Sequence, residues 1–239
     1  MALIASEDFE GGAPGDQVVL ANTSFTTFSG GDSSTLTLDS KLLWSGNSFK
    51  LTYVGTFRQA RWNITPTGTI KSRFFVNFGV FPSNQAGFAS LRGSGSYIAQ
   101  LQIRNAGTVR IQNGQTAIDA SIFDLSLDTT YYLEWEVGAG AQVLRIYSAD
   151  GATLLDTLSG AAVDAPIDQI GLGAPNAETY TAWMDTPAFD DATQPGYPGV
   201  IDPDPGTTDT YIWDGTQLVA ADVYVWDGSA LVASDANIA

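Results

Sequence analysis

Two glutamates one residue apart are the first side chains whose spacing could support catalysis. Glu134 and Glu136 flank Trp135. Alternate residues of a β-strand point to the same face, and a retaining glycosidase needs two carboxyl groups about 5 Å apart. Such an enzyme also needs an acid that protonates the leaving group, whereas residues 138–140, a few positions after the pair, are Gly-Ala-Gly. We therefore interpret the pair as the polar side of a strand and predict that the protein is not an enzyme.

The chain contains neither histidine nor cysteine. Without imidazole it lacks the commonest general base, the usual nitrogen ligand of metals and every mechanism that pairs histidine with serine or cysteine. Without thiols it has no disulfide framework, no thiolate nucleophile and no zinc–thiolate site.

Acidic residues near both ends of the first 191 residues could bind a hard cation. Asp8 and Glu10 lie close to the start of the chain, and Asp185 lies near the other end of this region. The first and last strands pair in many sandwiches, and calcium takes about six to eight oxygen ligands. We predict a structural calcium at these three residues and no other cofactor. The alternative is that they are ordinary surface acids, because the sequence has no contiguous calcium loop such as an EF-hand.

The polar side of one expected hairpin is the candidate ligand-binding site. Residues 97–104 and 108–112 alternate apolar and polar side chains around an Asn-Ala-Gly turn, with Tyr97 on the apolar side. The polar side carries amides and guanidiniums, which hydrogen-bond sugar hydroxyls: Gln100, Gln102, Arg104, Arg110 and Gln112. Trp44 and Trp62 could supply rings that stack on a sugar. The alternative is that these polar residues serve solubility and that the aromatic residues form the core.

Short alternating segments between Gly, Asn, Asp and Pro clusters indicate an all-β protein, an antiparallel β-sandwich. No segment keeps an apolar stripe of helical spacing for three turns. In 130–137 the pattern places Tyr131, Leu133, Trp135 and Val137 inward. The expected strands are residues 49–53, 69–81, 97–104, 108–112, 130–137, 142–148, 153–158 and 169–172.

Length and charge limit the partners of the protein. The 239 residues are 44% hydrophobic, and ten Lys and Arg against 26 Asp and Glu give a net charge of −16. This charge repels nucleic acid and anionic membranes, so we predict that neither is a partner. The first residues show no basic segment followed by an apolar run, so we expect no signal peptide and no membrane anchor.

The composition changes after residue 191. Residues 192–210 contain four prolines and three glycines and predict an extended linker between a domain at 1–191 and a tail at 211–239. The tail repeats Tyr-Ile/Val-Trp-Asp-Gly with a period of thirteen, starting at Tyr211 and Tyr224. Asp-Gly favours a type I′ turn, so each copy is predicted to be a small hairpin. Because such a hairpin cannot bury its own aromatic residues, we predict that Tyr211, Trp213, Tyr224 and Trp226 serve assembly of a homo-oligomer, with a trimer as our expectation.

Four motifs in residues 7–191 resemble, in their order, the concanavalin A-like (laminin-G-like) jelly rolls: Glu7-Asp-Phe-Glu-Gly-Gly, Thr130-Tyr-Tyr-Leu-Glu-Trp-Glu-Val, Leu144-Arg-Ile-Tyr-Ser-Ala-Asp-Gly and Trp183-Met-Asp. The closing strand of that family often carries two adjacent acids, whereas this chain has Asp185-Thr-Pro. The tail is similar to the Trp-Asp-Gly repeats of virion proteins, especially minor tail proteins, of phages that infect actinobacteria.

These resemblances imply a phage virion protein, assembled in the host cytoplasm with other virion proteins as partners. The expected function is that of a minor tail protein whose lectin-like sandwich contacts host surface glycans. Two alternatives are a capsid decoration protein and a glycan-binding or glycan-cleaving domain.

Overall fold

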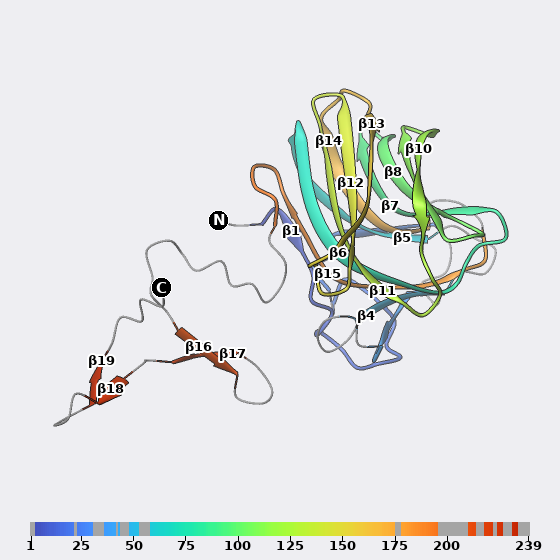
Figure 1. Cartoon of the computed structure of the whole chain (residues 1–239). Coiled ribbons are helices and arrows are strands. Elements are labelled where there is room, and N and C mark those ends of the chain that lie inside the picture. The colour runs from blue at the N-terminus through green and yellow to red at the C-terminus, as the bar shows by residue number, and fades with distance from the viewer. Residues whose placement is uncertain are drawn as a thin grey trace. The chain divides into compact units, whose positions relative to one another are not determined.

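The structure is a computed structural model that describes residues 3–21, 23–30, 36–41, 43, 48–52, 58–174 and 178–195, together with four short strands of the tail. The chain divides into two compact units, residues 1–197 and 198–239. The first unit is a sandwich of two antiparallel sheets (Figure 1), which confirms the predicted fold class. Within the described residues, no helix is long and apolar enough to cross a membrane.

Sheet A contains eight strands: β1 (Ala5–Ser6), β3 (Leu36–Asp39), β4 (Ser48–Thr52), β6 (Thr69–Val80), β11 (Thr130–Gly138), β12 (Ala141–Ser148), β13 (Leu154–Ala161) and β15 (Thr181–Asp190). Their order is β13-β12-β11-β6-β15-β4-β3, with β1 added along β15.

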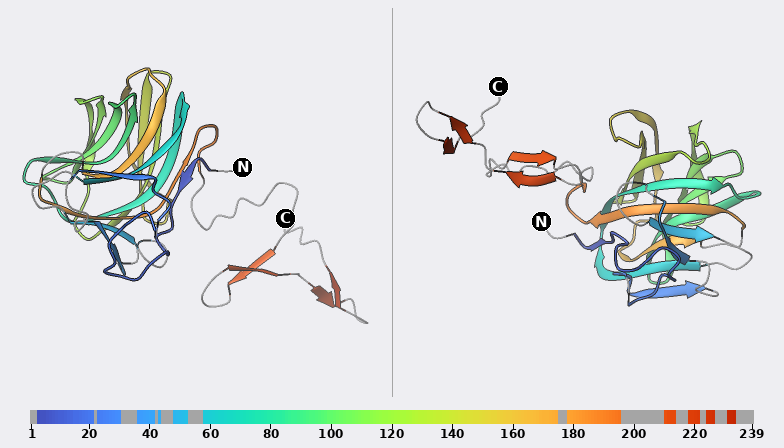
Figure 2. Two further views of the ribbon diagram at one scale, coloured as in Figure 1. Left: turned by 180° about the vertical axis from the view of Figure 1, so that it is seen from behind. Right: turned by 90° about the horizontal axis from the view of Figure 1, so that it is seen from below.

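Sheet B contains seven strands: β2 (Thr27–Gly30), β5 (Arg58–Thr67), β7 (Gln85–Gly93), β8 (Ser96–Arg104), β9 (Thr108–Asn113), β10 (Thr116–Asp124) and β14 (Ile167–Ala174). Their order is β10-β9-β8-β7-β14-β5-β2. The two sheets form curved layers that face each other (Figure 2). Each sheet therefore has one face toward the core and one face away from it.

The core lies between the sheets, as the period-two pattern predicts. In β11 the side chains of Tyr131, Leu133, Trp135 and Val137 are buried in the central hydrophobic cluster, which confirms the predicted phase of this strand.

One buried amide links the two sheets inside this core. Trp135 Nε1 donates to Gln142 Oε1 at 3.2 Å. Gln142 Nε2 donates to the carbonyl of Gln112 in sheet B at 2.8 Å and to that of Ala161 at 2.9 Å. Every polar atom of the Gln142 amide has a hydrogen-bond partner. These bonds offset the free-energy cost of removing the amide from water.

Carboxylates connect the edge strands β10 and β13 of the two sheets. Asp156 Oδ2 in β13 accepts hydrogen bonds from the backbone N–H groups of Ile122 at 2.7 Å and Phe123 at 3.1 Å in β10. In return, Asp119 Oδ2 in β10 accepts from Ser159 N in β13 at 3.1 Å. These bonds give acceptors to N–H groups that would otherwise be unpaired at a sheet edge.

The first and last strands of the sandwich pair, as the sequence predicts. Ala5 of β1 lies opposite Phe189 of β15, and Glu7 N donates to the carbonyl of Pro187 at 3.1 Å. The start of the chain is therefore anchored to sheet A.

Among the described residues of the second unit, four short strands form two hairpins. β16 (Thr210–Trp213) pairs with β17 (Leu218–Ala221), and β18 (Tyr224–Trp226) pairs with β19 (Leu231–Ala233). In each copy the tryptophan before Asp-Gly lies opposite the leucine after it: Trp213 opposite Leu218, and Trp226 opposite Leu231.

Candidate functional site

The face of sheet B that points away from the core is the candidate functional site. We call it the polar face and define it by the amide, hydroxyl, guanidinium and phenol groups that it presents: Gln59, Arg61, Gln85, Ser90, Arg92, Tyr97, Gln100, Gln102, Arg104, Arg110 and Gln112. These residues come from the adjacent strands β9, β8, β7 and β5, with β14 between the last two.

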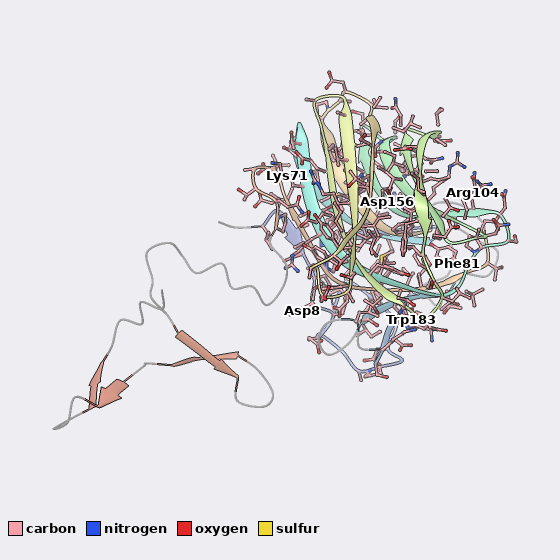
Figure 3. All side chains as sticks on the ribbon, in the orientation of Figure 1. Asp8, Lys71, Phe81, Arg104, Asp156 and Trp183 are labelled. Atoms are coloured by element: carbon pink, nitrogen blue, oxygen red, sulfur yellow. The ribbon has the colours of Figure 1, made fainter. Side chains whose placement is uncertain are left out.

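The five residues predicted from the hairpin lie together on this face. Gln100 pairs with Gln112 and Gln102 pairs with Arg110 across β8 and β9, and Arg104 continues the row on β8. Arg104 and Lys71, which belongs to sheet A, lie on opposite sides of the sandwich (Figure 3). Antiparallel pairing places directly opposite side chains on the same face, so these groups can contact one ligand.

Three of these side chains are fixed by hydrogen bonds to backbone or side-chain oxygens nearby. Gln100 Nε2 donates to the Gly114 carbonyl at 2.7 Å, and Gln112 Nε2 donates to the Gln115 carbonyl at 3.3 Å. Arg110 Nη1 donates to Gln85 Oε1 at 3.0 Å. The face is therefore preorganised, which lowers the entropy cost of binding a ligand.

A glycine in β14 allows side chains of the strands on both sides to meet over it. Gln59 Nε2 in β5 donates to Ser90 Oγ in β7 at 2.9 Å, above Gly171. A Cβ at Gly171 would lie 2.9 Å from Ser90 Oγ and 3.2 Å from Gln59 Nε2, so a larger residue would displace this bond. Gln59 Oε1 also accepts from Arg61 Nε at 3.2 Å and Nη2 at 2.9 Å, which orients the guanidinium.

Burial and like charge both act on the guanidiniums of the polar face. Burial lowers the pKa of Arg61, and the positive charge of Arg92 lowers it further, while Tyr97 opposes this change. Burial likewise lowers the pKa of Arg110, with a further contribution from Arg104. Arginine stays protonated despite such shifts, so the face keeps its positive charge.

Two polar atoms of this face are buried and have no hydrogen-bond partner among the described residues. They are Oε1 of Gln102, a residue that is 6% exposed, and Nε of Arg92. The Arg92 guanidinium lies 4.4 Å from the centre of the Tyr97 ring. A buried acceptor and a buried donor without partners cost free energy unless a ligand or water supplies the missing bonds.

The predicted inward direction of Tyr97 is wrong. The register between β7 and β8 shifts between Leu91 and Arg92, and Ile98 enters the core cluster while Tyr97 lies beside Arg92. A β-bulge adds one residue to a strand and so reverses the direction of the side chains beyond it.

The aromatic residues that the sequence offered for stacking are not on this face. Trp62 is 3% exposed and belongs to the core, where Trp62 Nε1 donates to Ser24 Oγ at 2.9 Å. Its neighbours Arg61 and Asn63 face outward because alternate residues of a strand alternate in direction. Trp44 lies outside the described residues.

Glu134 and Glu136 share the outer face of sheet A and hold structural contacts. Glu134 accepts hydrogen bonds from the hydroxyls of Tyr132 at 3.3 Å and Tyr147 at 3.2 Å. Glu136 forms an ion pair with Lys71 at 3.7 Å. The predicted shared direction of the two glutamates is confirmed, and each has a partner that accounts for its position.

The residues predicted to hold calcium do not gather in one cluster. Asp185 is fully buried in β15, whereas Asp8 and Glu10 are exposed and lie in the turn after β1, where Asp8 Oδ1 accepts from Glu10 N at 3.1 Å. Within the described residues, no group of three or more acidic side chains could hold a metal ion.

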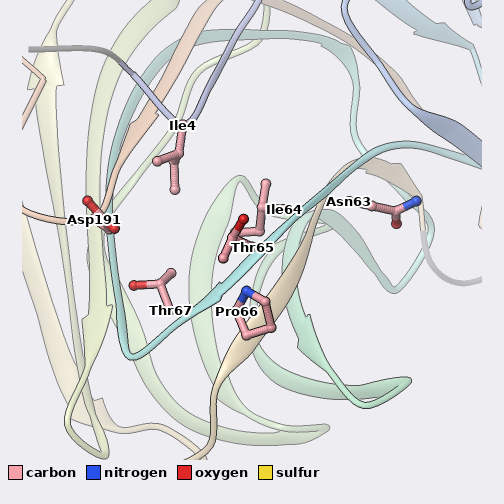
Figure 4. A pocket seen from close by; sticks show the side chains of 7 residues that line it. All are labelled: Ile4, Asn63, Ile64, Thr65, Pro66, Thr67 and Asp191. Atoms are coloured by element: carbon pink, nitrogen blue, oxygen red, sulfur yellow. The ribbon is translucent and has the colours of Figure 1, made fainter.

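A cavity of about 420 Å³ lies near one end of β5 (Figure 4). Its lining is Ile4, Asn63, Ile64, Thr65, Pro66, Thr67 and Asp191. Asn63 Oδ1 accepts from Gln169 Nε2 at 2.7 Å, so one of its polar groups is already bonded. With two threonine hydroxyls and one carboxylate besides, the cavity offers fewer convergent groups than the polar face.

Sequence analysis missed the half of the polar face that comes from β5 and β7. The alternation Gln59-Ala-Arg61-Trp-Asn63 in β5 and the triplet Ser90-Leu-Arg92 in β7 carry the same signal as the predicted hairpin. The sequence does not show that β7 follows β8 in the sheet, or that β14 brings β5 beside β7.

The sequence matches no protein-family model and no curated protein. A solved structure of Trypanosoma rangeli sialidase in complex with 2,3-difluoro-KDN is similar, with a TM-score of 0.50, 13% identity, and coverage of 79% of this chain and 30% of the sialidase. The binding domain of botulinum neurotoxin serotype D is also similar, with a TM-score of 0.50, 16% identity, and coverage of 79% and 47%. This chain thus spans less than half the length of either protein. At these identities the similarity concerns the jelly-roll-like sandwich fold alone.

Proposed function

We propose that this chain is a bacteriophage virion protein of the minor tail protein type, and that its sandwich binds a host surface glycan through the polar face. The observation that carries the binding proposal is the row of amides and guanidiniums across β9, β8, β7 and β5. Amides and guanidiniums are the groups that orient sugar hydroxyls, and the hydrogen bonds within the face hold them in place.

The virion assignment is supported by the tail. Two copies of Tyr-Ile/Val-Trp-Asp-Gly with a period of thirteen are similar to the repeats of phage virion proteins, and each copy forms a hairpin. Labelling purified particles with an antibody against the sandwich tests this proposal by electron microscopy. Label on the tail supports a minor tail protein, label on the capsid supports a decoration protein, and unlabelled particles would refute both.

Glycan binding is tested with the full chain on a panel of neutral and acidic oligosaccharides. Gln102→Leu removes the buried amide with little change in volume, and we expect it to weaken binding about tenfold. Gln115→Leu makes the same chemical change at an exposed turn residue outside the face and serves as the matched control. No binding to any oligosaccharide, or equal loss in both variants, would contradict the proposal.

The alternative of a glycan-cleaving domain predicts a different result. Reducing ends would accumulate when the protein is incubated with glycans that it binds, and Glu134→Gln would stop this release. We expect no release, because both glutamates are engaged with Tyr132, Tyr147 and Lys71 on the face of sheet A, away from the polar face.

A further inference from the structure

The lysines of this acidic chain and the arginines of the polar face differ in whether they form ion pairs. The chain has ten Lys and Arg and a net charge of −16. All three ion pairs of the described residues use lysines. In the same part of the chain, none of the arginines of the polar face forms an ion pair with a carboxylate: Arg61, Arg92, Arg104 and Arg110.

These four guanidiniums lie on one face, Arg61 and Arg92 on the strands at either side of β14, and Arg104 and Arg110 on the adjacent strands β8 and β9. Arg61 and Arg92 repel each other, as do Arg104 and Arg110. Each member is half-buried or exposed, so a ligand can approach it. An oxyanion placed between two guanidiniums would replace this repulsion with charge-assisted hydrogen bonds, the strongest kind that these groups make.

A ligand with two kinds of groups would supply the bonds that the buried atoms without partners lack. Gln102 Oε1 needs a hydrogen-bond donor and Arg92 Nε needs an acceptor. A sugar hydroxyl can donate to the amide oxygen, and a carboxylate or sulfate oxygen can accept from a guanidinium. A polymer of acidic sugars carries both groups on each unit.

We propose that the polar face selects acidic polysaccharides, with oxyanions of the sugar units bound by Arg61, Arg92, Arg104 and Arg110 and sugar hydroxyls bound by the glutamines between them. This inference rests on the glycan-binding function proposed above and specifies its ligand class. The shared chemistry is an oxyanion on a hydroxyl-rich chain, which carboxylated and sulfated glycans both provide.

A nucleic acid also carries oxyanions but fits this face less well. The face carries only one aromatic side chain, Tyr97, and its ring is already covered by Arg92. Binding of single strands depends on stacking of bases on such rings.

The test titrates the full chain with matched acidic and neutral ligands by calorimetry. Oligomers of galacturonate and glucuronate are compared with their methyl esters, and sulfated galactose oligomers with their desulfated forms. We expect at least about tenfold tighter binding of one acidic series than of its neutral counterpart, and weaker binding of that series as salt is raised. The series that shows the preference identifies the oxyanion as carboxylate or sulfate.

Charge-removing variants connect this preference to the face. Arg61→Gln with Arg110→Gln should abolish the preference for the acidic series while neutral sugars still bind. Arg145→Gln removes one positive charge from the outer face of sheet A and should leave the preference unchanged. Thermal melts of each variant establish that it is folded.

Three results would overturn the inference. Equal affinity for an acidic series and its neutral form would refute acid selection while leaving glycan binding intact. An oligonucleotide that binds as tightly as the acidic sugars would show attraction to polyanions in general. Binding of no sugar at all would refute the proposed function together with the inference.

Discussion

At the scale of the residue, the contacts of Trp135 predict how much one core side chain contributes to stability. Trp135 is buried between the sheets and hydrogen-bonded to Gln142. Trp135→Ala should lower the free energy of unfolding by about 3–5 kcal/mol through the cavity that it leaves. Glu134→Gln changes the preceding residue, whose side chain lies on the opposite face of β11. It should change the free energy of unfolding little. Urea unfolding of both variants measures the difference, and similar stabilities would mean that the phase of β11 is wrong.

The tyrosines that donate to Glu134 predict a loss of stability at alkaline pH. Burial raises the pKa of Tyr132, and the charge of Glu134 raises it further; the same two causes raise the pKa of Tyr147. Above the ordinary tyrosine pKa of about 10, the unfolded chain loses phenolic protons that the folded chain retains, so stability falls with rising pH.

Melting temperatures measured between about pH 8 and pH 11 check this prediction. The fall should be smaller in Tyr132→Phe, since phenylalanine has no proton to lose. Lysines titrate in the same range in both proteins, so only the difference between the two curves is informative. Identical slopes would show that Tyr132 ionises at its ordinary pKa.

At the scale of the element, the carboxylates between β10 and β13 predict how the edge of the sandwich is held. Asp156→Ala leaves the N–H groups of Ile122 and Phe123 without their acceptor and should destabilise the protein by about 1–2 kcal/mol. Hydrogen exchange should rise at β10 before the rest of sheet B. Asp164→Ala, an exposed acid after β13, is the matched control. If hydrogen exchange at β10 is the same in Asp156→Ala as in the wild type, Asp156 does not hold this edge strand.

At the scale of the whole molecule, the two hairpins of the tail predict self-association. A two-stranded hairpin is marginal in water, and each copy carries tyrosine and tryptophan at the positions predicted to serve assembly, Tyr211 and Trp213 in one and Tyr224 and Trp226 in the other. We expect the full chain to sediment as an oligomer, a trimer in our proposal, and Trp213→Ser with Trp226→Ser to shift it toward the monomer. A wild-type monomer at micromolar concentration would leave the hairpins as an attachment site for another virion protein.

Metal dependence is a second property of the whole molecule. Because Asp185 is buried while Asp8 and Glu10 are exposed, we expect chelator to leave the melting temperature unchanged. A fall in the melting temperature that Asp185→Asn abolishes would instead restore the predicted calcium. The comparison uses protein dialysed with and without added calcium.

The sequence by itself determined the all-β class and the phase of β11. These features depend on local alternation and on turn residues, which a single chain segment contains in full. The same alternation placed Gln100, Gln102, Arg104, Arg110 and Gln112 on one face.

Only the tertiary structure decided which distant strands extend that face. It also decided where a side chain points or is buried against the expectation from the local pattern. The order of sheet B brings Gln59 and Arg61 near Ser90 and Arg92 over Gly171, although about thirty residues separate these pairs in the chain. A bulge turns Tyr97 outward, which depends on register with a neighbouring strand and not on the strand's own sequence. Trp62 is buried because the opposite sheet covers it, and burial of this kind is a property of the packed layers.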